Sequence, residues 1–202
     1  MKNIYYILSI VTISLILACS NTTKSQETSV AVENNTVTEK ETAEGWIQLF
    51  NGKNLEGWEV KINGFASGEN AFNTFRVKNN SLVVSYENYD HFKDYFGHIF
   101  YKNSYSNYRL RLDYRFVGEQ CKGGEGWATK NSGVMIHSQS PESMEKDQEF
   151  PVSIEVQLLG GIEKPWKRPT ANLCTPGTHV NINDKLVTTH CISSSSETYY
   201  GE

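Results

Sequence analysis

The chain has 202 residues, of which 38% are hydrophobic and 12% aromatic, and its formal net charge is −4 at pH 7. Its 19 basic residues form no cluster that could neutralise the phosphates of a nucleic acid. Composition and charge therefore argue against a nucleic-acid partner. They fit a globular domain whose aromatic rings pack in a β-sheet or stack on sugars.

The first residues are typical of a bacterial lipoprotein signal. Lys2 precedes an apolar run over residues 4–17 that is too short to span a membrane. The run ends in Ile16-Leu17-Ala18-Cys19, which resembles a lipobox. We therefore expect residues 1–18 to be a signal peptide and Cys19 to carry lipid, anchoring the protein in the bacterial cell envelope, in the outer membrane or facing the periplasm. An ordinary secretory signal that precedes a cysteine by chance is the alternative.

Two further segments follow the predicted signal peptide. Residues 19–44 are rich in Ser, Thr, Asn, Glu and Lys and contain only scattered apolar residues. Such a segment cannot bury enough apolar surface to offset the entropy lost on ordering, so we expect a lipid-anchored, disordered tether. Residues 45–202 are enough for one domain with a hydrophobic core.

Alternating apolar and polar residues recur through residues 45–202 and predict many short strands. The first predicted strand is residues 46–50. It is followed by Asn51-Gly52, a dipeptide typical of type I′ hairpin turns, which should end the strand. The other predicted strands are residues 75–78, 81–86, 96–101, 107–117, 132–138, 151–159, 178–182 and 185–189, with Asn79-Asn80 and Asn183-Asp184 as further turns. No long helical pattern interrupts them. The sequence therefore predicts an all-β, antiparallel β-sandwich of the jelly-roll type.

The longest predicted strand, residues 107–117, has two contrasting faces. One face holds Tyr and Leu side chains and should be part of the core. The other holds Arg109, Arg111, Asp113 and Arg115. This polar face is either ordinary solvated sheet or the lining of a concave site.

Three cysteines remain if Cys19 is lipidated, and an exported protein favours one disulfide among them. A hairpin at Asn183-Asp184 brings Cys174 close to Cys191, which makes these two the predicted pair. A zinc site that also uses His179 and His190 is the alternative. Because His190 and Cys191 are adjacent and point to opposite faces of a strand, tetrahedral coordination is disfavoured.

The sequence contains no familiar catalytic signature, such as Gly-x-Ser-x-Gly, a phosphate-binding Gly loop, His-Glu-x-x-His or an EF-hand loop. The candidates are therefore polar residues on strand faces. Glu155 and Gln157 are two residues apart and project from one face of their strand, about 6.5–7 Å apart along it. His137 lies in the preceding strand, just after Asn131 and its neighbours. The structural alternatives are a solvated Glu155, a hydrogen-bonded sheet histidine and a salt-bridged Arg face.

The block from Gly45 to Trp58 resembles the opening motif of the 3-keto-disaccharide hydrolase family, with a Trp, a Leu-Phe-Asn-Gly-Lys and a second Trp. Further matches are Asn131-Ser132-Gly133, Glu155-x-Gln157, residues 172–180 and His190-Cys191, and together they span most of residues 45–202. The Asp that often follows Glu-x-Gln in the family is replaced here by Gly160-Gly161. The resemblance implies a concanavalin A-like lectin/glucanase fold. Because family members continue with further strands, it also implies a domain that is incomplete at its C-terminus.

The resemblance implies cleavage of glycosides whose C3 hydroxyl is already oxidised. A C3 ketone acidifies the C2 proton, so a base can form an enolate that expels the C1 substituent, and water can then add to the product. We expect Glu155 to be the base or a metal-directing carboxylate and His137 to be a base or acid. Gln157 is the expected substrate hydrogen-bond donor, and Asn131 is a further substrate-binding residue.

Two substrate-binding roles stay open at this point. Arg111 or Arg115 would stabilise the enolate if their face lines the cleft, and a divalent metal ion is the alternative stabiliser. The expected partners are an oxidised glycoside and, through Cys19, a membrane. A non-catalytic carbohydrate-binding module on the same fold is the second functional hypothesis, since fold does not determine function.

Overall fold

The computed structural model describes residues 36–162, 168–193 and 200–201. The predicted signal peptide, the lipidation site at Cys19 and most of the predicted tether lie outside these residues. Across the described ranges, no helix has the length and apolar character needed to cross a membrane. The last part of the predicted tether contains a short helix, α1 (Glu39–Ala43), which Thr38 and Glu41 cap reciprocally.

The regular secondary structure of the described residues consists almost entirely of short strands. In chain order these are β1 (Trp58–Ile62), β2 (Phe75–Lys78), β3 (Ser81–Val84), β4 (Gly97–Tyr101), β5 (Asn131–Ile136), β6 (Ile154–Leu159), β7 (Arg168–Pro169), β8 (Asn172–Cys174), β9 (Val180–Ile182), β10 (Lys185–Val187), β11 (Cys191–Ile192) and β12 (Tyr200–Gly201). In the described part of the chain, three short 3-10 helices lie between the strands: η1 (Ala71–Asn73), η2 (Gly126–Ala128) and η3 (Pro141–Ser143). The strand pairings in this part of the chain are all antiparallel. The predicted all-β, antiparallel sandwich class is confirmed, while the jelly-roll connectivity stays a prediction.

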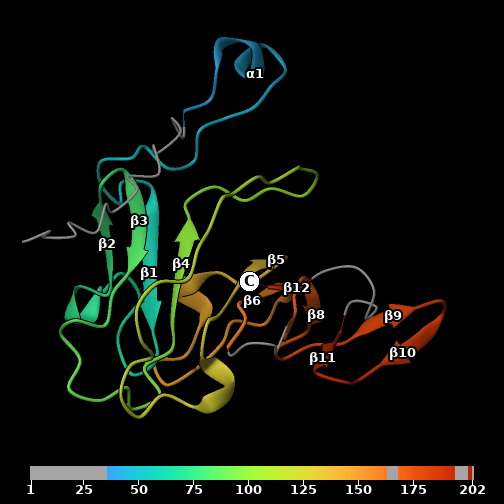
Figure 1. The fold of residues 1–202 in the computed structure, drawn as a ribbon. Helices are drawn as coiled ribbons and strands as arrows, with labels where there is room; N and C mark the ends of the chain where they lie inside the picture. Colours follow the sequence, from blue (N-terminus) through green and yellow to red (C-terminus); the bar gives the residue numbers. More distant parts are fainter. Residues whose placement is uncertain (1–35, 163–167, 194–199, 202) are drawn as a thin grey trace, which may run out of the picture. The chain divides into compact units, whose positions relative to one another are not determined.

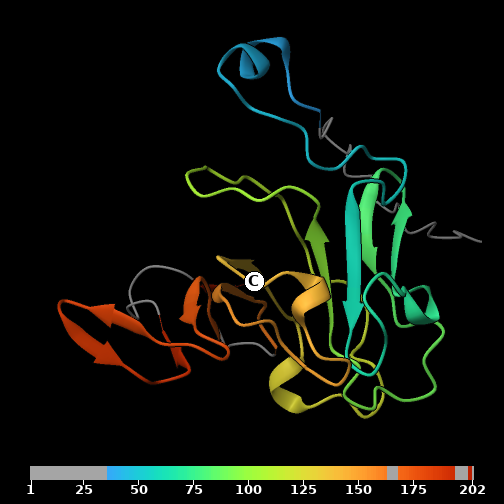
Figure 2. The same ribbon diagram turned by 180° about the vertical axis from the view of Figure 1, so that it is seen from behind.

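The first half of the domain forms one packed layer. β1 pairs with β4, and β2 pairs with β3 (Figures 1 and 2). Val60, Ile62 and Phe75 are buried in a common cluster that also includes side chains of β3 and β4. The β2–β3 turn is formed by Asn79 and Asn80 with φ of 52° and 59°, as the sequence predicts for a type I′ hairpin.

The second half forms a four-stranded sheet in the order β11-β8-β6-β5 (Figure 1). β5 and β6 pair over their full length, from Asn131 opposite Leu159 to Ile136 opposite Ile154. The β9–β10 hairpin projects from this sheet, and Asn183 and Asp184 form its turn with φ of 50° and 61°. This turn is also the predicted one.

Polar contacts connect the first layer to the segment that leads into β6. The buried Lys61 of β1 donates from Nζ to the carbonyl of Lys146 at 2.9 Å. His98 of β4 places Nε2 2.7 Å from the carbonyl of Glu149. Burial lowers the pKa of both groups, because desolvation disfavours a charged amine or imidazole. These contacts hold the segment before β6 against the first layer.

Two predicted strands are wrong. Residues 46–50 form no strand, and their end is an Asx turn in which Asn51 Oδ1 accepts from the backbone N–H groups of Lys53 and Asn54. Residues 107–117 also form no strand, and the Tyr and Leu side chains expected in the core are exposed. Both segments alternate correctly, but neither finds a neighbouring backbone to pair with, and alternation alone does not provide one.

Candidate functional site

One face of the four-stranded sheet, here called the polar face, carries Glu155, Gln157 and Asn172 in two neighbouring rows of paired residues. Residues that pair directly across antiparallel strands point to the same face of the sheet. In one row, Gln157 of β6 lies between Gly133 of β5 and Asn172 of β8. In the next row, Glu155 lies between Met135 of β5 and Cys174 of β8. Glu155 and Gln157 therefore share one face, as the strand period predicts.

This polar face is the more buried side of β6. Ser153 and Leu159, which share the face with Glu155, are buried. On the opposite face, Val152 and Val156 are 42% and 38% exposed. The burial of the face that carries Glu155 matters for chemistry, because a carboxylate there loses much of its hydration.

Glu155 is a carboxyl group in a desolvated position. Burial raises its pKa from 4.5 to about 7. Its neighbours across the strands are the thioether of Met135 and the fully buried Cys174, which offer an ionised carboxylate no compensating charge. No hydrogen bond or ion pair to the Glu155 carboxylate is found among the described residues. The group can therefore exchange a proton near neutral pH.

Gly133 makes room for the Glu155 carboxylate. A Cβ at Gly133 would overlap Oε1 of Glu155 and lie 2.7 Å from its Cγ and Cδ. Because Gly133 pairs directly with Gln157, the Glu155 side chain leans across β5 towards the row of Gln157. Glycine inside a strand often marks such a close approach, so Gly133 is a residue that the sequence analysis missed and that this signal could have pointed to.

Gln157 is held by the buried Asn172. Asn172 Nδ2 donates to Gln157 Oε1 at 2.9 Å and to the carbonyl of Pro169 at 3.0 Å. Asn172 lies within the family-like stretch 172–180, but nothing in the sequence pattern links its side chain to Gln157. The contact depends on the pairing of β6 with β8, which the sequence did not predict.

A disulfide closes the sheet beside Glu155. Cys174 and Cys191, the pair that the sequence predicts, are joined and lie directly opposite each other in β8 and β11. Both sulfurs are therefore used in a covalent bond and are not thiolate ligands. Over the residues that the structure describes, no group of three or more His, Cys, Asp or Glu side chains gathers as a metal site.

His137 and Asn131 lie at opposite ends of β5. His137 follows the strand with a φ of 50°, is exposed, and has no described hydrogen bond to Glu155. Asn131 begins the strand on the same face as Gly133, and its Nδ2 donates to the carbonyl of Trp127 at 3.1 Å. Asn131 therefore lies on the polar face, one row beyond Gly133 and Gln157, whereas His137 lies beyond the end of the regular sheet.

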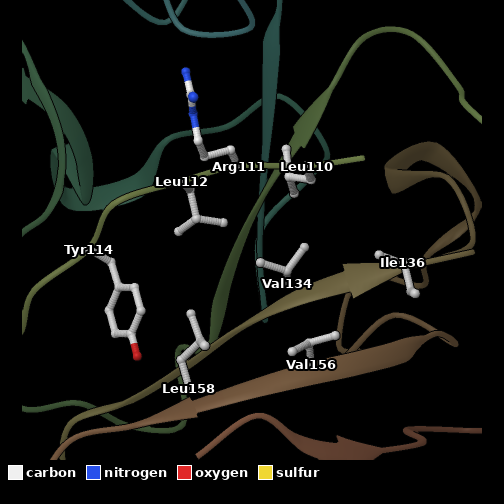
Figure 3. A pocket seen from close by; sticks show the side chains of 8 residues that line it. All are labelled: Leu110, Arg111, Leu112, Tyr114, Val134, Ile136, Val156 and Leu158. Atoms are coloured by element: carbon white, nitrogen blue, oxygen red, sulfur yellow. The ribbon is translucent and has the colours of Figure 1, made fainter. Parts of the chain in front are cut away.

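The two candidate arginines are not brought to the polar face. Arg111 forms an ion pair with Glu41 at 2.7 Å, and its guanidinium lies 5.2 Å from the ring centre of Trp46. Arg115 is exposed on the same irregular segment. That segment lies over the apolar face of β5 and β6, and Figure 3 shows Arg111 pointing away from the strands.

Between this segment and the sheet is a groove of about 410 Å³. Aliphatic side chains of β5 and β6 line one side of it, and Leu110, Leu112 and Tyr114 line the other (Figure 3). Among the residues that the structure describes, Arg111 is the only charged one that lines the groove, and it already forms an ion pair with Glu41. The polar face of the sheet, around Glu155 and Gln157, is therefore the candidate site.

Gly133→Ala should displace the Glu155 carboxylate without unfolding the sheet. The added Cβ forces Glu155 into another rotamer, and a misplacement of about 1 Å can lower a catalytic rate by up to about 100-fold. We expect a fall in kcat with little loss of unfolding free energy. Gly126→Ala is the matched control, because a Cβ there meets no atom within 4 Å. Equal activity of the two variants would show that the Glu155 position is not critical.

Comparison with known proteins agrees with the motifs. Residues 45–197 match the model of a family described as 3-keto-alpha-glucoside-1,2-lyase-like domain. No curated protein and no solved structure matches the chain. The matched range includes both rows of the polar face. It supports, at a coarse level, a role in carbohydrate chemistry.

Proposed function

Because the chain belongs to the 3-keto-alpha-glucoside-1,2-lyase-like domain family, we propose that it cleaves 3-keto-glycosides by elimination, with Glu155 as the base. The observation that supports this role most directly is the desolvated Glu155 carboxyl group, whose pKa of about 7 suits proton transfer at neutral pH. An unperturbed carboxylate is a weaker base and would remove a carbon-bound proton less readily.

The proposed reaction needs no oxidant, since the substrate already contains the ketone. Glu155 removes the proton from C2, and the electron pair of that C–H bond forms the C2–C3 double bond of an enolate. The enolate then collapses to the ketone, a double bond forms between C1 and C2, and the C1–oxygen bond breaks. The leaving alkoxide takes up a proton, and water adds across the new double bond to complete a net hydrolysis.

Gln157 is the proposed donor to the enolate oxygen. Its amide shares the strand face with Glu155, and Glu155 leans towards its row over Gly133. A base and a donor on one strand face can contact C2 and the C3 oxygen of the same sugar, each at hydrogen-bond distance of about 3 Å. A donor already in place stabilises negative charge without reorganising during the reaction.

A non-catalytic sugar-binding module is the second proposal. Trp127 is 52% exposed, and one face of its ring stacks on Phe96 with centroids 5.5 Å apart. Half-exposed aromatic side chains of this kind can bind glycans without chemistry.

Turnover of matched substrates decides between the two proposals. The complete chain is incubated with a 3-keto-glucoside or its unoxidised counterpart in D₂O, with and without chelator. We expect aglycone release only from the keto substrate, with deuterium at C2 of recovered sugar. Binding of both sugars without release would reject the enzyme and support the module. If aglycone is released without chelator and not in its presence, enolate stabilisation would be assigned to a metal ion.

A further inference from the structure

We propose that Asn172 is a positioning residue that fixes the orientation of the Gln157 amide, so that its nitrogen donates to the C3 oxygen of the substrate. This inference rests on the proposed elimination reaction. It concerns a residue that makes no contact with the reacting atoms and acts through Gln157.

The orientation of Asn172 follows from its second partner. The backbone carbonyl of Pro169 can only accept a hydrogen bond, so the Asn172 atom 3.0 Å from it must be Nδ2. The other hydrogen of the same nitrogen is directed at Gln157, 2.9 Å away. A donor requires an acceptor, and the Gln157 atom in that contact is therefore Oε1. The amide assignment thus rests on a carbonyl whose role cannot be reversed.

The orientation of Gln157 follows in turn. The oxygen and nitrogen of its planar amide lie on opposite branches, so the contact to Asn172 directs Nε2 to the other side. No residue in the described ranges accepts a hydrogen bond from Nε2. Asn172 is only 5% exposed, so water has little access to replace its contact with Gln157. The buried asparagine therefore presents Gln157 as a donor.

Only this orientation suits an enolate. A nitrogen donor stabilises the negative charge that develops on the C3 oxygen, whereas an amide oxygen in the same place would repel it. If Gln157 were free to rotate, the unproductive orientation would be populated in the resting enzyme. Asn172 removes that population before the substrate binds.

Asn172→Asp tests the proposal by reversing the hydrogen bond. An ionised aspartate only accepts, so Gln157 must turn and direct Nε2 at residue 172. We expect kcat on the 3-keto-glucoside to fall about 10- to 100-fold, because one preorganised oxyanion donor is turned away. KM should change less. Asn181→Asp in the exposed hairpin strand β9 adds the same charge away from the sheet and should leave kcat unchanged.

A double-mutant cycle with Gln157→Ala separates positioning from structure. When the Gln157 amide is absent, Asn172→Asp should cause no further loss of kcat. If instead the full loss persists in the Gln157→Ala background, Asn172 has only a structural role and the proposal is overturned.

NMR of the Gln157 side-chain amide in the unmutated chain gives a readout that needs neither turnover nor a folded variant. We expect its Nε2 protons to exchange with water as free protons. Nε2 protons that are protected by Asn172 would overturn the proposed orientation. If the orientation is found but no 3-keto-glycoside is cleaved, the proposed function fails while the geometric assignment holds.

Discussion

Glu155→Gln should lower kcat for a 3-keto-glucoside by about 10²- to 10⁴-fold, the range expected when a general base is removed. Glutamine keeps the shape of the side chain and fits the same space over Gly133, so the sheet should remain folded. The loss would therefore report basicity and not packing. Glu119→Gln is the matched control, because Glu119 is exposed in a loop and the substitution removes the same charge. An unchanged kcat in Glu155→Gln would remove Glu155 as the base and leave the reaction class open.

The pH dependence gives a second readout of the same residue. A base must be ionised to accept a proton, so kcat/KM of the unmutated chain should rise with pH and level off above about pH 7, the pKa of Glu155. A profile that is already level from pH 5 upward would contradict an active Glu155 with this pKa.

Stability should change with pH in the opposite direction from activity. The pKa of Glu155 is raised in the folded protein, so its protonated form is favoured by folding. Its contribution to stability is fully present below its usual pKa of 4.5 and is lost as pH rises through about 7. Urea unfolding should show that the unfolding free energy falls less between pH 5 and pH 8 for Glu155→Gln than for the unmutated chain. Identical declines would indicate that Glu155 is not desolvated.

The features that sequence predicted well are those set by local geometry. Asn79-Asn80 and Asn183-Asp184 form turns because Asn and Asp adopt a positive φ at a low conformational energy, and the turn needs two such residues in succession. Glu155 and Gln157 share a face because the side-chain period of a strand is two. Neither result depends on which strand lies next to which.

The features that sequence missed are set by strand neighbours. Residues 107–117 alternate as well as β6 does, yet they pair with no strand, and their apolar side chains face a groove. Gly133 is significant only because β5 places it beside Glu155, and Asn172 only because β8 places it beside Gln157. Pairing across long sequence separations is not encoded in the period of one segment.

Removing the Cys174–Cys191 disulfide should produce the largest loss of stability of the substitutions considered. The two cysteines are 17 residues apart, and a closed loop of this size restricts the unfolded chain by about 3 kcal/mol. We expect a Cys174→Ala, Cys191→Ala variant to lose unfolding free energy of about this size in urea. Cys121→Ala is the control, because it removes a sulfur that closes no loop.

The same variant tests whether the disulfide supports the site. β8 holds Asn172 on one side of Gln157 and Cys174 beside Glu155. In the described residues its pairing with β11 is short and comprises Cys174 opposite Cys191 and Leu173 opposite Ile192. Without the covalent bond, this short pairing should open more often, and Asn172 should hold Gln157 less firmly. At temperatures where the variant is still folded, kcat should therefore fall while the control is unaffected. Unchanged kcat together with lost stability would show that β6 alone positions Gln157, and that the disulfide acts on the unfolded chain.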